Sequence, residues 1–181
     1  MALASATRVG PYEIVSVLGS GAMGEVYRAR DTRLDRNIAL KIISEECLTD
    51  TSRRRRFVQE ARSASALNHP NIVVIHDFGT HDGISYIASE LVEGQSLRDL
   101  IRRGALPMPQ LLDIAIQIAD GLAAAHQSGI VHRDLKPENI MTGEFGEVLV
   151  LDWGIAQIAA AVGIDLSICL QGGRERQKIL K

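Results

Sequence analysis

The sequence predicts an α+β fold, with a complete β-rich N-terminal lobe that carries one helix and a partial helical C-terminal lobe. Short strand-like apolar runs fill most of residues 12–90, around a single stretch of helical periodicity. The stretch VEGQS at 92–96 has the composition of a connector, and helical spacing dominates after it. With 181 residues, 46% of them hydrophobic, the chain can form one domain or two small lobes, each with a core.

The N-terminal lobe is predicted over residues 12–90, after an extension at 1–11. A helix is expected from an N-cap at Ser52 to Leu67, and Pro70 prevents its continuation. Its buried stripe is predicted to be Phe57, Ala61, Ala64 and Leu67. Strands are predicted at 12–18, 25–30, 37–43, 72–78 and 84–89, the last two joined by the turn-rich GTHDG.

A hinge is predicted at 91–95 and a partial C-terminal lobe at 96–157. Ser96 is the expected N-cap of a short helix that ends near Gly104. Pro109 then opens a long helix, for which Gly129 is the expected C-cap. Its apolar positions at helical spacing are Leu111, Ala115, Ile118 and Leu122. Residues 158–181 form an unassigned tail.

Composition narrows the class of protein. A net charge of −2 gives no indication of a nucleic-acid partner, and RRRR at 53–56 fits the solvated first turn of a helix. Cys47 and Cys169 lie far apart without metal-like spacing, so two reduced thiols and a cytoplasmic location are expected. The apolar stretch 148–170 contains two aspartates, each of which costs roughly 2.5–3.5 kcal/mol near a bilayer centre, so no membrane span is predicted.

Residues suited to phosphate chemistry first occur in the N-terminal lobe. The stretch GSGAMGEV contains Gly19, Gly21 and Gly24, and glycines let backbone N–H groups approach phosphate oxygens. Strand patterns on both sides place this loop in a hairpin, which disfavours a dinucleotide site. Lys41 stands in the strand-like run IALKII, which by itself favours a solvent-facing lysine, and Glu60 lies on the predicted helix near the buried stripe.

Two further groups of charged residues stand in the second lobe. HRDLKPEN at 132–139 follows the apolar pair Ile130-Val131, and Pro137 restrains the loop. Asp152 ends the buried-strand pattern VLVL, where a carboxylate needs a partner. The next residue, Trp153, is the only tryptophan in the chain.

Together these motifs resemble the eukaryotic-type protein serine/threonine kinases, in the style of the bacterial members. The resemblance covers roughly residues 10–157 and implies phosphoryl transfer from ATP, with Mg²⁺, to serine or threonine hydroxyls of proteins. It implies catalytic roles for Asp134, Lys136, Lys41 and Glu60. It implies magnesium ligands at Asn139 and Asp152. It implies nucleotide contacts at Gly19, Gly21, Gly24, Val26, Ala39, Lys41, Glu90, Val92 and Met141.

The sequence departs from the family pattern in two places. Trp153 stands where phenylalanine is usual, in contact with residues matching His132, Ala64 and Ile75, and the small Ala64 is expected to make room for it. After Gln157 the tail contains no A-P-E-like motif and no threonine, so a C-terminally truncated catalytic domain with weak or absent activity is expected. A non-catalytic ATP-binding relic or scaffold remains an alternative. A small-molecule phosphotransferase of related fold is disfavoured by the RDLKP context of Asp134.

Overall fold

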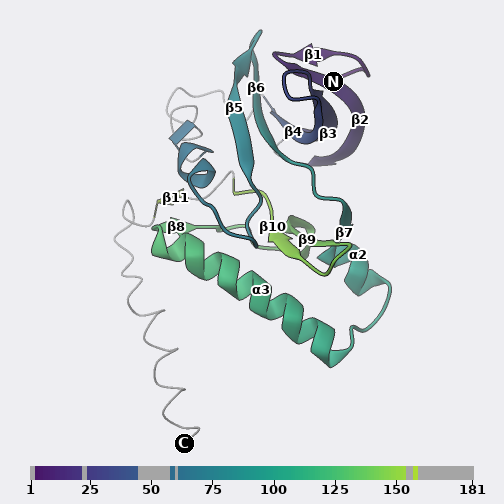
Figure 1. The fold of residues 1–181 in the computed structure, drawn as a ribbon, viewed down its shortest axis with the longest axis vertical. Coiled ribbons are helices and arrows are strands. Elements are labelled where there is room, and N and C mark those ends of the chain that lie inside the picture. The colour runs from purple at the N-terminus through teal and green to yellow at the C-terminus, as the bar shows by residue number, and fades with distance from the viewer. Residues whose placement is uncertain (1–2, 22–23, 45–57, 60, 154–156, 159–181) are drawn as a thin grey trace, which may run out of the picture.

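The computed structural model describes residues 3–21, 24–44, 58–59, 61–153 and 157–158 (Figure 1). Its N-terminal part is a six-stranded antiparallel sheet with strand order β1-β2-β3-β4-β6-β5. The strands are β1 (Arg8–Val9), β2 (Tyr12–Gly21), β3 (Gly24–Asp31), β4 (Arg36–Ile43), β5 (Ile75–His81) and β6 (Ile84–Glu90). The segment predicted as an extension thus contributes β1 to the sheet. Residues 58–59 and 61–65 are helical, and Ala61, Ala64 and Leu67 are buried as predicted.

The strand predicted at 72–78 begins and ends later than expected. It starts at Ile75 and runs to His81, so that Asp82 and Gly83, both with positive φ, make a tight hairpin turn to β6. Ile72 leaves this strand because it forms a parallel bridge with Val150, which lies far away in the sequence. A long-range pairing of this kind leaves no trace in local periodicity.

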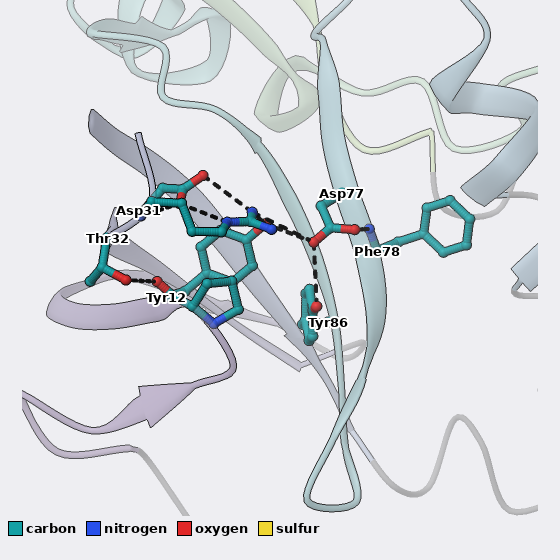
Figure 2. A network of polar contacts seen from close by, with 8 residues as sticks. Tyr12, Asp31, Thr32, Asp77, Phe78 and Tyr86 are labelled. Atoms are coloured by element: carbon teal, nitrogen blue, oxygen red, sulfur yellow. Dashed lines mark hydrogen bonds and ion pairs between the residues drawn. The ribbon is translucent and has the colours of Figure 1, made fainter. Parts of the chain in front are cut away.

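One face of the sheet carries an apolar core. Beside this core, a network of polar contacts joins strands that are not neighbours in the sheet. Tyr12 on β2 and Tyr86 on β6 meet edge to face, with ring centroids 5.5 Å apart, so the sheet curls enough to bring non-adjacent strands into contact. The Tyr12 hydroxyl donates to Asp77 on β5 at 2.8 Å (Figure 2). Arg33 donates to the same hydroxyl at 2.9 Å and to the buried Asp31 at 3.2 Å. These contacts fasten β2 and β3 to β5 and β6.

The second part is helical, with small sheets between its helices. It contains β7 (Gly94–Ser96), α2 (Leu97–Arg102), α3 (Met108–Gln127), β8 (Ile130–Val131), the 3₁₀ turn η2 (Pro137–Asn139), β9 (Ile140–Gly143), β10 (Val148–Val150) and β11 (Gln157–Ile158). The predicted N-cap is confirmed, because the Ser96 hydroxyl accepts from the Asp99 N–H. The C-cap of α3 is Ser128, and Gly129, which was predicted for that position, is the next residue, with φ of 75°. Strands β10, β9 and β7 form one sheet and β11 pairs with β8.

The buried face of α3 differs from the predicted one. Ile114, Gly121 and Ala125 are its buried residues, whereas Leu111 is 44% exposed and Ala115 is also exposed. Ile118 and Leu122 are partly buried against the core. The spacing identified the helix correctly but not its orientation, because apolar residues occupy far more of its circumference than the core covers.

A seam outside the 91–95 connector joins the two parts. The Val73 N–H donates to the Val150 carbonyl at 3.1 Å, and the Val150 N–H donates to the Asn71 carbonyl at 3.0 Å. Asn71 packs against Gly121 of α3, where a Cβ would lie 2.9 Å from its carbonyl oxygen, so this close approach requires glycine.

Within the described ranges, none of the helices combines the length and the apolar character that crossing a bilayer requires.

Candidate functional site: a nucleotide-type cleft between the lobes

A cleft of about 640 Å³ opens between the sheet and the helical part. Val26 and Ala39 line it from the sheet, and Met141 on β9 lines it from the other lobe. Val92 closes its inner edge, and no hydrogen bond joins the backbone N–H or C=O of Val92 to another described residue. A flat heteroaromatic ring suits this site. Its faces can lie between the two apolar walls, and polar atoms at its edge can bond to the N–H and C=O of Val92.

Glu90, also predicted to touch the nucleotide, is already engaged by its own lobe. Its N–H donates to the Val74 carbonyl at 2.9 Å, and its carboxylate accepts from the Val74 N–H at 2.7 Å. Its side chain and N–H therefore hold the strand end in place, so any contact to a bound ring falls to its carbonyl oxygen. Before it in the chain, Ser89 lines the cleft with a small side chain.

The glycine-rich turn forms the outer roof of the cleft. Gly19 lines the cleft, and Gly21 pairs with Gly24 where β2 and β3 approach their connection. Gly24 has φ of 132°, and a Cβ there would lie 1.8 Å from the Ile42 carbonyl oxygen on β4. Packing of the roof on the sheet therefore requires glycine at 24, independently of any ligand.

A lysine and an aspartate meet at the rear of the cleft. Lys41 extends from β4 and forms an ion pair with Asp152, which follows β10. Both side chains are mostly buried, with exposures of 18% and 23%, and both line the cleft. Glu60, the partner predicted for Lys41, lies outside the described residues. Asp152 has φ of 61°, a left-handed conformation that is uncommon outside glycine and that directs the chain sharply away from β10.

The HRD stretch is anchored from within by its histidine. His132 is 2% exposed, and its Nε2 lies 2.8 Å from the Leu151 carbonyl oxygen. Because a carbonyl only accepts, Nε2 must carry the proton. The Leu151 N–H in turn donates to the Asn139 carbonyl at 2.8 Å. These two bonds lock the loop against the residue before Asp152.

Asp134, Lys136 and Asn139 form the functional end of that loop. Lys136 Nζ donates to Asp134 Oδ2 at 2.6 Å, and Asn139 Nδ2 donates to the Asp134 carbonyl at 2.9 Å. The Lys136 hydrogen bond lowers the pKa of the Asp134 carboxyl, and the same contact raises the pKa of Lys136. Arg133 adopts φ of 64°, which turns the chain between the buried His132 and the half-exposed Asp134.

The donor atoms at the cleft floor fit a hard divalent cation. Asn139 uses its amide nitrogen within the loop, so its Oδ1 is the atom left for a ligand. Asp152 supplies a carboxylate from the next segment, and both residues line the cleft. Mg²⁺ in phosphate sites is commonly held by one or two such oxygens together with substrate phosphates.

Trp153 packs as the resemblance implied. It is 1% exposed, within a core cluster that includes Ala64, with Ile75 packed at the edge of that cluster. Its ring meets His132 edge to face, with centroids 4.7 Å apart. One contact was not predicted: the indole N–H donates to the Val150 carbonyl at 2.9 Å.

Nine of the fourteen predicted site residues line one cleft, and the structure adds several that sequence reasoning missed. Asp134, Lys136, Gly21 and Gly24 are not among the lining residues, and Glu60 lies outside the described residues. Arg28 and Glu93 line the mouth of the cleft and form an ion pair at 3.5 Å. No motif marks either of them. Further lining residues that were not predicted are Leu18, Val73, Ile75, Ile87, Leu91 and Leu151. Most of these residues are apolar and form the walls of the cleft. The alternation of apolar and polar residues predicted that they lie in strands, but it did not predict which face of the sheet lines the cleft.

A two-lobed fold with a glycine-rich roof, a Lys–Asp pair and an Asp-Lys-Asn loop defines a phosphotransferase class of protein. The protein kinase domain family matches residues 12–164, and the chain belongs to that family. The match extends past Gln157, where the resemblance was expected to end.

Its relatives are bacterial serine/threonine kinases. The chain is 46% identical to serine/threonine-protein kinase PrkC of Bacillus subtilis, over 86% of this chain and 24% of that protein. It is 43% identical to PknE of Mycobacterium bovis, over 83% of this chain and 27% of that protein. The crystal structure of the Mycobacterium tuberculosis PknI kinase domain superposes with a TM-score of 0.78 at 35% identity, covering 91% of this chain and 71% of that one. The chain thus spans about a quarter of the length of the curated relatives it matches.

Proposed function

We propose that the cleft binds ATP with Mg²⁺ and that the site is built to transfer the terminal phosphoryl group to serine or threonine hydroxyls of proteins. One observation carries this proposal: an unbroken series of contacts runs from the cleft to the exposed loop. Lys41 pairs with Asp152, Leu151 bonds to Asn139, and Asn139 bonds to Asp134, whose carboxylate bonds to Lys136.

Each side chain has a role that its contacts support. Lys41, now paired with Asp152, would turn to the α- and β-phosphates, while Asp152 and the Asn139 Oδ1 would hold the cation. Bound Mg²⁺ would supply charge neutralisation at the phosphates. Asp134, ionised at neutral pH and bonded to Lys136, would accept or orient the substrate hydroxyl proton, and Lys136 beside it would stabilise the transferred group.

The ring of the nucleotide would lie between Val26 and Ala39 on one side and Met141 on the other, with its edge at Val92. The glycines at 19, 21 and 24 would cover its phosphates. Because ATP is a cytoplasmic metabolite, we place this activity in the cytoplasm.

For the 181-residue chain itself, we propose weak or absent transfer despite the nucleotide-type cleft. Support comes from the sequence after Gln157, which contains no A-P-E-like motif for peptide docking. Leu135 in the catalytic loop is 43% exposed, so the described residues cover it only in part.

The test is incubation of the purified chain with radiolabelled ATP, Mg²⁺ and a generic protein substrate, beside Asp134→Asn. Isothermal titration with a non-hydrolysable ATP analogue measures binding in both proteins. Binding by both chains, with any transfer lost in Asp134→Asn, supports the proposal. Binding without transfer in either chain agrees with the absent transfer proposed for this chain, and equally with the alternative, an ATP-binding scaffold. Absence of Mg²⁺-dependent nucleotide binding to the folded chain contradicts the proposal.

A further inference from the structure

Helix α3 is apolar over a much wider arc than its core contacts use. Its buried residues are Ile114, Gly121 and Ala125. Beside that face runs a second stripe at helical spacing, hereafter the outer stripe, which is exposed in the described structure. Its members are Met108, Leu111, Leu112, Ala115, Ile116 and Ala119.

The outer stripe is unusual for a protein surface. Met108 is 65% exposed, Leu112 is 53% exposed and Ile116 is 57% exposed, all on one helix. Single apolar residues on a surface need no explanation, but a contiguous row of large ones marks a contact surface. A helix that is apolar on two sides is normally covered on both.

The chain itself continues from a point beside this helix. Strand β11 pairs with β8, with Ile158 opposite Ile130, and Ile130 follows closely on the last residue of α3, Gln127. Ile158, the last described residue before this segment, therefore lies near the C-terminal end of α3. The next residues in the sequence, AAAVGIDLSICL at 159–170, are almost entirely apolar, with Asp165 as their only charge.

We propose that residues 159–170 cover the outer stripe of α3 within the same chain. A segment of this length can span up to about 40 Å, while α3 is about 30 Å long, so the segment reaches the whole stripe from its starting point. Attachment beside the helix gives it a high effective concentration there, which favours it over a second copy or another protein. The proposal is independent of nucleotide chemistry, so the proposed function can fail without affecting it.

The native thiol of Cys169 supplies a direct test. In a Cys47→Ser background, Cys169 is the only cysteine, and Ala115→Cys adds a second thiol in the middle of the outer stripe. Asp113→Cys is the matched control, because positions two apart on a helix face different directions and Asp113 is also exposed. Mild oxidation of dilute protein, followed by mass spectrometry, should give an intramolecular disulfide in the Ala115→Cys chain, at least tenfold faster than in the Asp113→Cys chain.

Two results would overturn the proposal. Equal or negligible cross-linking at both positions would show that the segment does not lie on the stripe. Disulfide-linked dimers of the Ala115→Cys chain would show that a second copy occupies it.

A second measurement needs no cysteine. Hydrogen exchange of α3 amides should be slower in the 181-residue chain than in a chain that ends at Ile158. The shorter chain should also bind a hydrophobic dye more strongly. Identical exchange and dye binding in the two chains would contradict the proposal.

Discussion

The packing of Trp153 against Ala64 gives the sharpest test of how this core tolerates its tryptophan. Trp153 is 1% exposed, so the ring area that phenylalanine lacks is fully buried. About 40 Å² of apolar surface at roughly 25 cal/mol per Å² is worth about 1 kcal/mol. Loss of the indole hydrogen bond to Val150 adds about 1 kcal/mol. The Val150 carbonyl keeps its bond from Val73, so no buried acceptor is left unpaired. We expect Trp153→Phe to lower the free energy of unfolding by about 2 kcal/mol.

The compensating partner is Ala64, which is 2% exposed in the same cluster. Ala64→Leu alone should cost about 1–3 kcal/mol through overpacking. With Trp153→Phe present, the leucine side chain gains the vacated space, so we expect a favourable coupling of about 1–2 kcal/mol and a double variant that is less destabilised than the sum of the two single variants. Ile14→Val, in the separate core of the sheet, is the control and should be additive with Trp153→Phe.

Urea unfolding should be followed by far-UV circular dichroism, because Trp153 is the only tryptophan and its fluorescence disappears in the variant. Costs of Trp153→Phe and Ala64→Leu that add to within about 0.5 kcal/mol would refute size compensation.

Three further predictions concern the cleft and the catalytic loop. Because Lys136 lowers the pKa of Asp134, the stabilisation from this contact is present above the unfolded pKa of about 3.9 and is lost as pH falls through the lower folded pKa. Lys136→Met should therefore raise the Asp134 pKa in a carboxyl NMR titration, and an unchanged titration would contradict this. Ser89→Met should weaken inhibitors with bulky groups aimed past this residue by at least about tenfold, or 1.4 kcal/mol, whereas equal affinity would show that no rear pocket opens there. Arg28→Ala should speed release of a fluorescent ATP analogue by up to about fivefold at low salt, because exposed ion pairs are worth about 0–1 kcal/mol. A charge-swapped chain that carries Arg28→Glu and Glu93→Arg should restore slow release. An effect of Arg28→Ala that persists in high salt would argue against the ion pair.

The sequence predicted the strands near the glycine turn well, because hairpins are local. Alternation and turn residues at 12–43 correspond closely to β2, β3 and β4. For α3, periodicity predicted the helix but pointed to a face that includes the exposed Leu111 and Ala115. A helix with apolar residues on two sides does not specify which side meets the core.

The candidate site could be predicted because its motifs fix residue types at fixed spacings. What spacing could not give is the present partner of a charged side chain. Lys41 is paired with Asp152, more than a hundred residues away in the chain, and Trp153 donates to Val150. Such contacts depend on which segments the fold places together, and one sequence carries no direct signal for that.

The seam between Val73 and Val150 changes what a cut at the connector would do. Because Asn71 and Val73 hydrogen-bond to β10 while the chain continues from them into β5 of the sheet, the lobes are joined at two places. A protease that nicks the chain at 91–95 would therefore leave two pieces that stay associated under native conditions and part only in denaturant. Any rocking of one lobe on the other would turn about a line through both junctions rather than about a single flexible point.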